Sequence, residues 1–285
     1  GGDAERETLN IVNDRAGAPY FVDKEGEYWR AYLFIEDATC FDQVENDEDF
    51  YQSALAFGNF QRLLADYPAD TLHETIPDFH NTVKRFANFK KAVEEDACGR
   101  AADVQKEIQF VLEREQLAHT LVDLQDAGKL PLRVTHNDTK LNNIMIDNAT
   151  HKGICVIDLD TVMPGLSLND FGDSIRFGAS TAAEDEQDIS KVSCDLHLVE
   201  VYVKGFLEGC GGALTDLEVE MLPMGAILMT FECGMRFLAD HLEGDHYFRI
   251  HRENQNLDRA RTQFKLVWDM EQKLSEMKAI VEKYK

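Results

Sequence analysis

The sequence predicts an α+β protein, with a small β portion at the N-terminus and a large, mainly helical portion after it. Three observations support this. Residues 9–36 are rich in aromatic and branched residues and contain turn signals, which is typical of β-strands. Most of the later chain has apolar residues at helical spacing, and a short β-rich island lies at 132–159. We therefore expect two units, residues 1–37 and residues 38–285, with a hinge near Glu36.

In the β portion, strands are predicted at 20–22 and 28–35, with a turn around Gly26 between them. The second of these is expected to be the last strand before the hinge.

In the helical portion, Asn46 and the acidic residues behind it predict an N-cap, followed by a helix that ends at Tyr67-Pro68. The remaining helices are expected at 83–93, 104–124, 188–206, 217–242 and 257–285.

Composition restricts the class of partner. The formal net charge of −24 repels nucleic acid and anionic membrane surfaces, so neither is expected as a partner. The charge would suit a cationic substrate, although an acidic surface more often serves solubility. No apolar run approaches the length that crosses a bilayer, which also argues against a membrane protein.

The cysteines show neither metal-ligand spacing nor a paired motif, so we expect reduced, mostly buried thiols in a cytoplasmic protein. They are Cys40, Cys98, Cys155, Cys194, Cys210 and Cys233.

The β-rich island contains the residues that predict the chemistry. His136, Asp138, Lys140 and Asn143 follow one strand, and a hairpin then leads to a second strand that ends at Asp158. Phosphoryl transfer suits this set, because its transition state is anionic and catalysis is mainly positioning and charge neutralisation. Protein kinases use the same order of Asp, Lys and Asn before a hairpin that ends in a metal-binding Asp.

Each residue of this loop has a predicted role. Asp138 accepts the proton of an attacking hydroxyl. Asn143 and Asp158 offer one amide and one carboxylate oxygen to Mg²⁺, which prefers few protein ligands alongside phosphate oxygens. Lys140 can meet the transferred phosphoryl group, and His136 is expected to brace the loop through hydrogen bonds. The expected ligands are a nucleotide triphosphate with Mg²⁺ and a small molecule that carries a hydroxyl.

Residues 170–172 spell the Asp-Phe-Gly of protein kinases, but no strand leads into them. We therefore place the metal ligand at Asp158. We expect Asp170 and Asp173 to cap the following helix or to hydrogen-bond the catalytic loop. Asp160 shares the strand face of Asp158 if the strand continues, so it touches metal or substrate, or it is a solvated carboxylate.

The loop, together with Ile157-Asp158, resembles the aminoglycoside phosphotransferase and choline kinase superfamily, which has a protein-kinase-like fold. Longer blocks are similar to the N-acetylhexosamine 1-kinases of that superfamily, and the likeness runs from about Glu7 to the C-terminus. The blocks are residues 133–143, 157–161, 170–180 and 232–240.

The resemblance implies an ATP-dependent, Mg²⁺-requiring kinase that phosphorylates the anomeric hydroxyl of N-acetylglucosamine or N-acetylgalactosamine. It implies that Asp138 is the base and that Arg236 and Tyr247 contact the sugar. From the residues alone, Arg236 lies in an apolar helical stretch and needs either a ligand or a salt bridge to Glu232. Tyr247 alone is typical of ordinary packing.

The sequence departs from the superfamily pattern before Tyr28, where the Gly-rich hairpin, the Lys-bearing strand and the Glu-bearing helix are not recognisable. We expect the start of the small lobe to be missing, so that these residues alone hold ATP poorly or are inactive. The backbone of Phe34, Ile35 and Glu36 is still the expected place for adenine.

Three functions fit the sequence. The first is a sugar 1-kinase of the N-acetylhexosamine type. The second is a related kinase that acts on an aminoglycoside, choline or homoserine. The third is an inactive sugar-binding fragment or pseudokinase, against which the joint presence of Asp138, Asn143 and Asp158 argues. The sequence predicts neither the preferred epimer nor the nucleotide donor, and it leaves the oligomeric state open.

Overall fold

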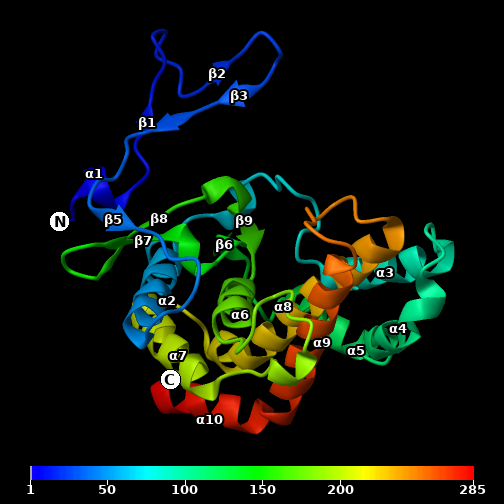
Figure 1. The fold of residues 1–285 in the computed structure, drawn as a ribbon. Coiled ribbons are helices and arrows are strands. Elements are labelled where there is room, and N and C mark those ends of the chain that lie inside the picture. The colour runs from blue at the N-terminus through cyan, green and yellow to red at the C-terminus, as the bar shows by residue number, and fades with distance from the viewer. Residues whose placement is uncertain (1) are drawn as a thin grey trace.

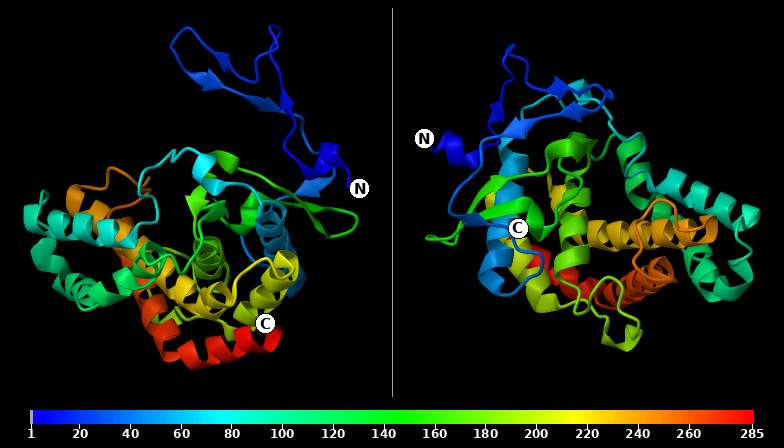
Figure 2. Two further views of the ribbon diagram at one scale, coloured as in Figure 1. Left: turned by 180° about the vertical axis from the view of Figure 1, so that it is seen from behind. Right: turned by 45° about the horizontal axis from the view of Figure 1, so that its top comes forward.

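A mainly helical body carries an arm of two short antiparallel strand pairs near the N-terminus (Figure 1). The structure, a computed structural model, describes residues 2–285. The view from behind shows the same arm standing away from the body (Figure 2). The predicted α+β class is therefore confirmed.

The strands are β1 (Ile11–Val12), β2 (Phe21–Val22), β3 (Tyr28–Trp29), β4 (Ala31–Tyr32), β5 (Ala38–Thr39), β6 (Arg133–Thr135), β7 (Ile144–Asp147), β8 (Gly153–Val156) and β9 (Met163–Gly165). The helices are α1 (Ala4–Glu7), α2 (Asp47–Leu63), α3 (Thr82–Glu95), α4 (Gln105–Leu112), α5 (Glu115–Asp126), α6 (Ser167–Gly178), α7 (Leu196–Cys210), α8 (Asp216–Glu243), α9 (Gln255–Gln272) and α10 (Leu274–Tyr284). Short 3₁₀ helices occupy Ala69–Thr71, Ala101–Val104, Leu141–Asn143, Leu159–Thr161 and Ile189–Lys191.

The arm consists of the antiparallel pairs β1–β4 and β2–β3. Its strands are shorter than predicted, because the strand expected at 28–35 is interrupted at Arg30 and ends at Tyr32. Tyr28 and Trp29 are 73% and 61% exposed, so the arm buries no core of its own. A hairpin without a covered face is only marginally stable in water, which explains why the pairing stays short.

The chain leaves the arm at Glu36 and turns at Asp37, whose backbone is left-handed (φ 54°). Strand β5 then pairs with β7, which pairs with β8, so the sheet has the order β5-β7-β8. Helix α1 packs against β8, and Arg6 contacts the Asp147 carboxylate (2.8 Å). The division of the chain at residue 37 stays a prediction.

Several helix ends differ from those predicted. Asn46 does cap α2, with its side-chain oxygen accepting from Asp49 N (2.9 Å), but the helix ends at Leu63 rather than at Tyr67. The helix expected at 188–206 begins only at Leu196, because Asp195 caps it by accepting from the backbone N–H of His197 (2.8 Å).

Two predicted long helices are each divided in two, at a residue whose side chain contacts another part of the chain. The helix expected at 104–124 is split at Arg114, whose guanidinium forms a fork with the Glu271 carboxylate (3.0 and 2.9 Å). The helix expected at 257–285 is split at Lys273, whose ammonium donates to the carbonyl of Cys194 (2.8 Å). Helices α1 and α6 and strand β9 were not placed by the sequence.

Helix α8 forms the centre of the body, with α3, α6 and α9 packed against it. By length and composition alone, α8 could cross a membrane, so the expectation that no apolar stretch is long enough was wrong. However, 78% of its most apolar window is buried inside the protein, as expected of a core helix. Helix α2 packs along α7 at one side of this centre.

All six cysteines are free thiols. Cys155, Cys194 and Cys210 are buried, and Cys40 and Cys233 are partly buried. Cys98 is exposed, which departs from the mostly buried set that was expected. The cytoplasmic location stays a prediction.

Helices α6 and α8 approach most closely at two glycines. A Cβ on Gly172 would lie 2.3 Å from the carbonyl oxygen of Gly225 and 2.7 Å from the Met229 side chain. The neighbouring Phe171 side chain is fully buried. Gly172 therefore serves the packing of α6 onto α8, and Phe171 packs against Tyr202 and Phe206 of α7.

We predict that Gly172→Ala lowers the free energy of unfolding by about 1–3 kcal/mol, because the backbone of α8 cannot yield to the added methyl group. This loss is expected despite the better helix propensity of alanine. Chemical denaturation measures it. The matched control is Glu220→Ala, an exposed position on α8, which should change stability by less than about 0.5 kcal/mol. A Gly172→Ala protein as stable as the control would contradict the prediction.

Candidate active site

The predicted catalytic loop, residues 136–143, connects β6 to β7. Its course reverses at Asn137, whose backbone is left-handed (φ 64°), a conformation that asparagine tolerates better than most residues. The Asn137 amide group donates to the carbonyl oxygens of Thr135 (3.2 Å) and Thr161 (2.9 Å). The turn leaves Asp138 and Lys140 on the wall of a cavity.

Asp138, Lys140 and Asn143 lie together. The Lys140 ammonium is 2.7 Å from Asp138 Oδ1. The Asn143 amide group donates to the Asp138 carbonyl (2.7 Å) and to its Oδ2 atom (3.1 Å). Burial lowers the pKa of Lys140, but the charge and hydrogen bond of Asp138 raise it, and the net shift is upward. Lys140 therefore stays cationic beside the carboxylate.

His136 is buried and contacts only backbone with its ring nitrogens. Its Nε2 atom lies 2.8 Å from the carbonyl oxygen of Ile157, and its Nδ1 atom accepts from the N–H of Asp138 (3.3 Å). Nε2 therefore carries the proton of a neutral ring. These contacts fit the bracing role predicted for His136, since they tie the catalytic loop to the end of the β7–β8 hairpin.

Asn143 and Asp158 are brought together by the hairpin, because Ile157 N donates to the Asn143 carbonyl (2.9 Å). Strand β8 ends at Val156, so Asp158 follows the strand rather than ending it, and its backbone is left-handed (φ 58°). Within residues 2–285, neither the Asn143 side-chain oxygen nor the Asp158 carboxylate has a hydrogen-bond partner. Two free oxygens of these types fit Mg²⁺. Their role stays a prediction, and no cluster of three or more His, Cys, Asp or Glu able to hold a metal occurs in this part of the chain.

Asp160 does not lie on a continuation of the strand that leads to Asp158. The strand does not continue, and Asp160 lies in the 3₁₀ helix Leu159–Thr161, where it forms an ion pair with Arg30 of the arm. The condition for a shared strand face of the two carboxylates is therefore not met, and contact of Asp160 with metal or substrate stays a prediction. Asp160 does not line the cavity that Asp138 lines.

The expected adenine position lies where the arm ends. Phe34 is 84% exposed, Ile35 is buried, and Glu36 is exposed. The Glu36 carbonyl accepts from the Arg6 guanidinium (2.9 Å), so an N–H donor of the protein already contacts it. Nucleotide binding at this segment stays a prediction.

Two buried carboxylates of α6 hold the catalytic loop. Asp170 accepts from the backbone N–H of His136 (2.9 Å) and of Asn137 (2.8 Å), and Asp173 accepts from that of Thr139 (3.0 Å). Of the two roles predicted for these residues, bonding to the loop is the one present, and the first turn of α6 is not capped by them.

Burial affects the two carboxylates differently. Burial raises the pKa of Asp170, and the backbone N–H donors of the loop only partly oppose this. Burial would also raise the pKa of Asp173, but the Arg176 guanidinium and the Lys140 ammonium bring it below its usual range. Asp173 is thus held as an anion between two cations.

A cavity of about 570 Å³ opens beside the loop. Asp138 and Lys140 line one part of it, and Arg236 and Tyr247 line another. The Arg236 guanidinium donates to the Tyr247 hydroxyl (3.2 Å) and lies 5.2–5.5 Å from the ring centres of three aromatic residues. The rings are those of Phe79, Tyr247 and Phe248.

The salt bridge between Arg236 and Glu232, one of the alternatives from the sequence, is not formed. Glu232 instead contacts His80 Nδ1 (2.8 Å), and both residues line the cavity. Sequence reasoning missed this pair. Glu232 begins one of the family-like blocks, but no local pattern singles out His80, which is far away in the sequence.

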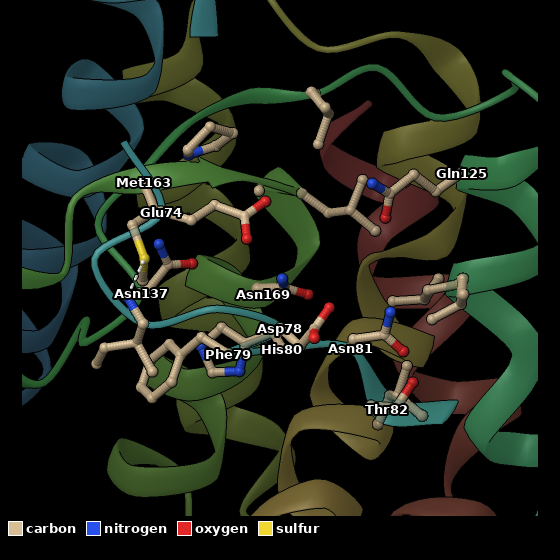
Figure 3. A pocket seen from close by; sticks show the side chains of 18 residues that line it. Glu74, Asp78, Phe79, His80, Asn81, Thr82, Gln125, Asn137, Met163 and Asn169 are labelled. Carbon is tan, nitrogen blue, oxygen red and sulfur yellow. Dashed lines mark hydrogen bonds between the residues drawn. The ribbon is translucent and has the colours of Figure 1, made fainter. Parts of the chain in front are cut away.

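A smaller cavity of about 150 Å³ shares Phe79, His80 and Asn137 with the larger one. Glu74 and Gln125 extend toward it from the segment before α3 and from α5 (Figure 3). Asp138 does not line it. The larger cavity is therefore the one that can hold an acceptor against the predicted base.

A sequence model of the phosphotransferase enzyme family, APH, matches residues 3–192. Three solved structures share the fold. An aminopropanol kinase associated with a microcompartment has a TM-score of 0.60 at 18% identity, covering 95% of this chain and 76% of that one. A choline kinase from Cryptosporidium parvum Iowa II has a TM-score of 0.59 at 14% identity, covering 95% and 75%.

The third is an amicoumacin kinase in complex with AMP-PNP, Ca²⁺ and Ami, with a TM-score of 0.56 at 12% identity, covering 94% of this chain and 72% of that one. At such identities the likeness shows the fold alone. Together with the family match, it confirms the superfamily predicted from the loop. The narrower likeness to N-acetylhexosamine 1-kinases stays a prediction.

We predict that Asp170→Asn loosens the catalytic loop. The asparagine amide has one oxygen, which accepts, and one nitrogen, which donates. Its nitrogen would face one of the two backbone N–H groups that Asp170 now accepts from, so that N–H group is left unpaired. The free energy of unfolding should fall by about 1–3 kcal/mol. Phosphoryl transfer should fall by about 10²-fold, because Asp138 is no longer held in place.

Chemical denaturation and kcat/KM measure these two effects. The control is Asp126→Asn at the exposed end of α5, which should leave both unchanged. Equal activity of the two variants would show that Asp170 does not position the loop.

Proposed function

The chain belongs to the phosphotransferase enzyme family, and from that premise we propose that it transfers the γ-phosphate of ATP to the anomeric hydroxyl of an N-acetylhexosamine. The family assigns it to the small-molecule kinases. The donor, the acceptor and the roles of individual residues are the proposal. The observation that supports it most is the position of Asp138 and Lys140 together on the wall of the 570 Å³ cavity.

The proposed reaction follows from that position. An acceptor hydroxyl in the cavity gives its proton to the Asp138 carboxylate while its oxygen bonds to the γ-phosphorus of ATP, and ADP leaves. Lys140 is 2.7 Å from Asp138 before substrates bind, and its ammonium can then turn to the transferred phosphoryl oxygens. Asn143 and Asp158 would hold Mg²⁺, which neutralises phosphate charge when bound. The AMP-PNP and Ca²⁺ in the amicoumacin kinase support a nucleotide with a divalent cation.

The charges of the cavity favour a neutral acceptor over a cationic one. Although the chain has a formal net charge of −24, five cationic side chains and four carboxylates line the cavity, a local balance of 5 − 4 = +1. They are Lys140, Arg176, Arg236, Arg249 and Arg259 against Asp138, Asp173, Glu184 and Glu232. Arg236 and Arg249 form no ion pair within residues 2–285. Unpaired guanidinium groups would repel an aminoglycoside or choline.

The aromatic side chains also suit a sugar. Phe79 and Phe248 offer apolar faces near Arg236, whose donors can meet a carbonyl such as that of an N-acetyl group. Tyr247 is 66% exposed, and its hydroxyl lies beside the same Arg236 guanidinium. These features support roles for Arg236 and Tyr247 in acceptor binding. The alternatives are a related kinase acting on an aminoglycoside, choline or homoserine, and a sugar-binding protein without turnover.

We predict phosphate transfer from ATP to N-acetylglucosamine or N-acetylgalactosamine, and none to kanamycin or choline, because the cavity has no excess of carboxylates. The assay follows sugar 1-phosphate and ADP together, with the chain extended at its N-terminus if the 285 residues alone bind ATP weakly. Transfer to kanamycin or choline, but to neither sugar, would reject the proposed acceptor. Sugar binding without ATP consumption by an extended chain would favour the protein without turnover.

We predict that Asp138→Asn lowers kcat by about 10²–10⁴-fold while the Kd for the sugar changes little. The amide keeps the shape of the side chain but cannot accept the hydroxyl proton. Steady-state kinetics and calorimetry separate the two effects, and Asp126→Asn again serves as the control. A near-normal kcat in Asp138→Asn would remove Asp138 from the role of base.

A further inference from the structure

We propose that the buried His80–Glu232 pair binds neighbouring hydroxyl groups of the acceptor, and so selects a hydroxyl-rich molecule and orients it toward Asp138. The inference rests on the proposed function, because it assigns a binding subsite within the same cavity.

The pair joins two separate elements of the body. His80 lies on the segment just before α3, and Glu232 lies in the middle of α8. His80 Nδ1 is 2.8 Å from Glu232 Oε1, and the two side chains are 9% and 1% exposed. The Phe79 ring lies against the His80 ring, with 4.3 Å between their centres, so the imidazole is clamped between the carboxylate and an aromatic face.

Each partner has one polar atom left over. His80 Nε2 and Glu232 Oε2 are buried and have no hydrogen-bond partner within residues 2–285. Buried polar groups are nearly always hydrogen-bonded, so two such atoms on one pair indicate a missing partner molecule. Both residues line the 570 Å³ cavity that Asp138 also lines.

The chemistry of the two atoms defines what can satisfy them. A carboxylate only accepts, so Nδ1 of His80 donates to Oε1, and Oε2 is left as a free acceptor. Nε2 of His80 accepts a hydrogen bond in a neutral ring and donates one in a protonated ring. Two neighbouring hydroxyl groups, each of which both donates and accepts, can satisfy both atoms, whereas a quaternary ammonium group has no N–H or O–H to give.

Arg236 lines the same cavity one helical turn after Glu232 on α8. Its guanidinium only donates, lies 5.2 Å from the Phe79 ring centre, and forms no ion pair with a carboxylate within the described residues. The cavity thus combines the free acceptor oxygen of Glu232 with the donors of Arg236. A molecule with hydroxyl groups and a nearby carbonyl matches this arrangement, and an ammonium-rich acceptor does not.

The test is calorimetric binding to the 285-residue chain without nucleotide. The ligands are N-acetylglucosamine and its 3-deoxy, 4-deoxy and 6-deoxy analogues. For the unmodified chain, we expect the loss of either of two neighbouring hydroxyls to raise Kd by about 10- to 100-fold. Glu232→Gln, which turns Oε2 from an acceptor into a donor, should raise Kd for the parent sugar by a similar factor. In the Glu232→Gln variant, one of the two deoxy analogues should also no longer bind more weakly than the parent sugar.

Glu220→Gln, on the exposed side of α8, is the matched control and should bind every sugar like the unmodified chain. His80→Phe keeps an aromatic ring but lacks Nε2, so it should weaken binding of the parent sugar and remove the difference in Kd between the parent sugar and the other deoxy analogue. If sugars bind but no deoxy analogue binds less tightly, or if Glu232→Gln binds the parent sugar normally, the pair is not the subsite and the sugar kinase proposal stands. If the unmodified chain binds none of the sugars while it phosphorylates another acceptor, the proposed function and the inference both fall.

Discussion

The geometry of the candidate site depends on one buried carboxylate. Asp170 accepts from the consecutive backbone N–H groups of His136 and Asn137, directly before the chain turns through the left-handed conformation of Asn137. Burial makes these bonds costly to replace, since an unpaired N–H group in this core has no water to turn to. The direction in which the chain carries Asp138 is therefore set from α6 rather than from the strands on either side. The residues that follow Asp170 then anchor α6 itself, because Phe171 is buried and Gly172 meets Gly225 of α8.

Electrostatics differ between the surface and the interior of this protein. The chain is strongly acidic as a whole, yet the cavity beside Asp138 has slightly more cationic than anionic side chains. Exposed charges are screened within about 10 Å, whereas those around a partly enclosed cavity are screened less. A substrate therefore experiences the local arginines and carboxylates more strongly than the net charge. The net charge is consistent with solubility and is a poor guide to the acceptor.

The sequence could predict those features that depend on short spacing. The loop from His136 to Asn143, the hairpin behind it and the Asn46 cap all rest on residues a few positions apart, and the structure has each of them. The rest depends on distant contacts. The helix breaks at Arg114 and Lys273 coincide with contacts to distant parts of the chain, and the contact of His80 with Glu232 joins residues with no shared pattern. The arm strands were over-predicted, because propensity cannot show that no core covers them.

The two faces of the catalytic loop have different surroundings, and this separates the two halves of the proposed reaction. Asp138 and Lys140 line the cavity, whereas Asn143 and Asp158 do not and lie toward the β7–β8 hairpin and the arm. Elements of the helical body, above all α8 and the segment before α3, build the acceptor side. The expected nucleotide side involves the segment at Phe34–Glu36, where side-chain exposure is high and the backbone already contacts Arg6. Under the proposed roles, the acceptor contacts only the body, whereas the nucleotide also contacts the segment where the arm ends. Asp170 links the two, because it fixes the single loop from which both faces project.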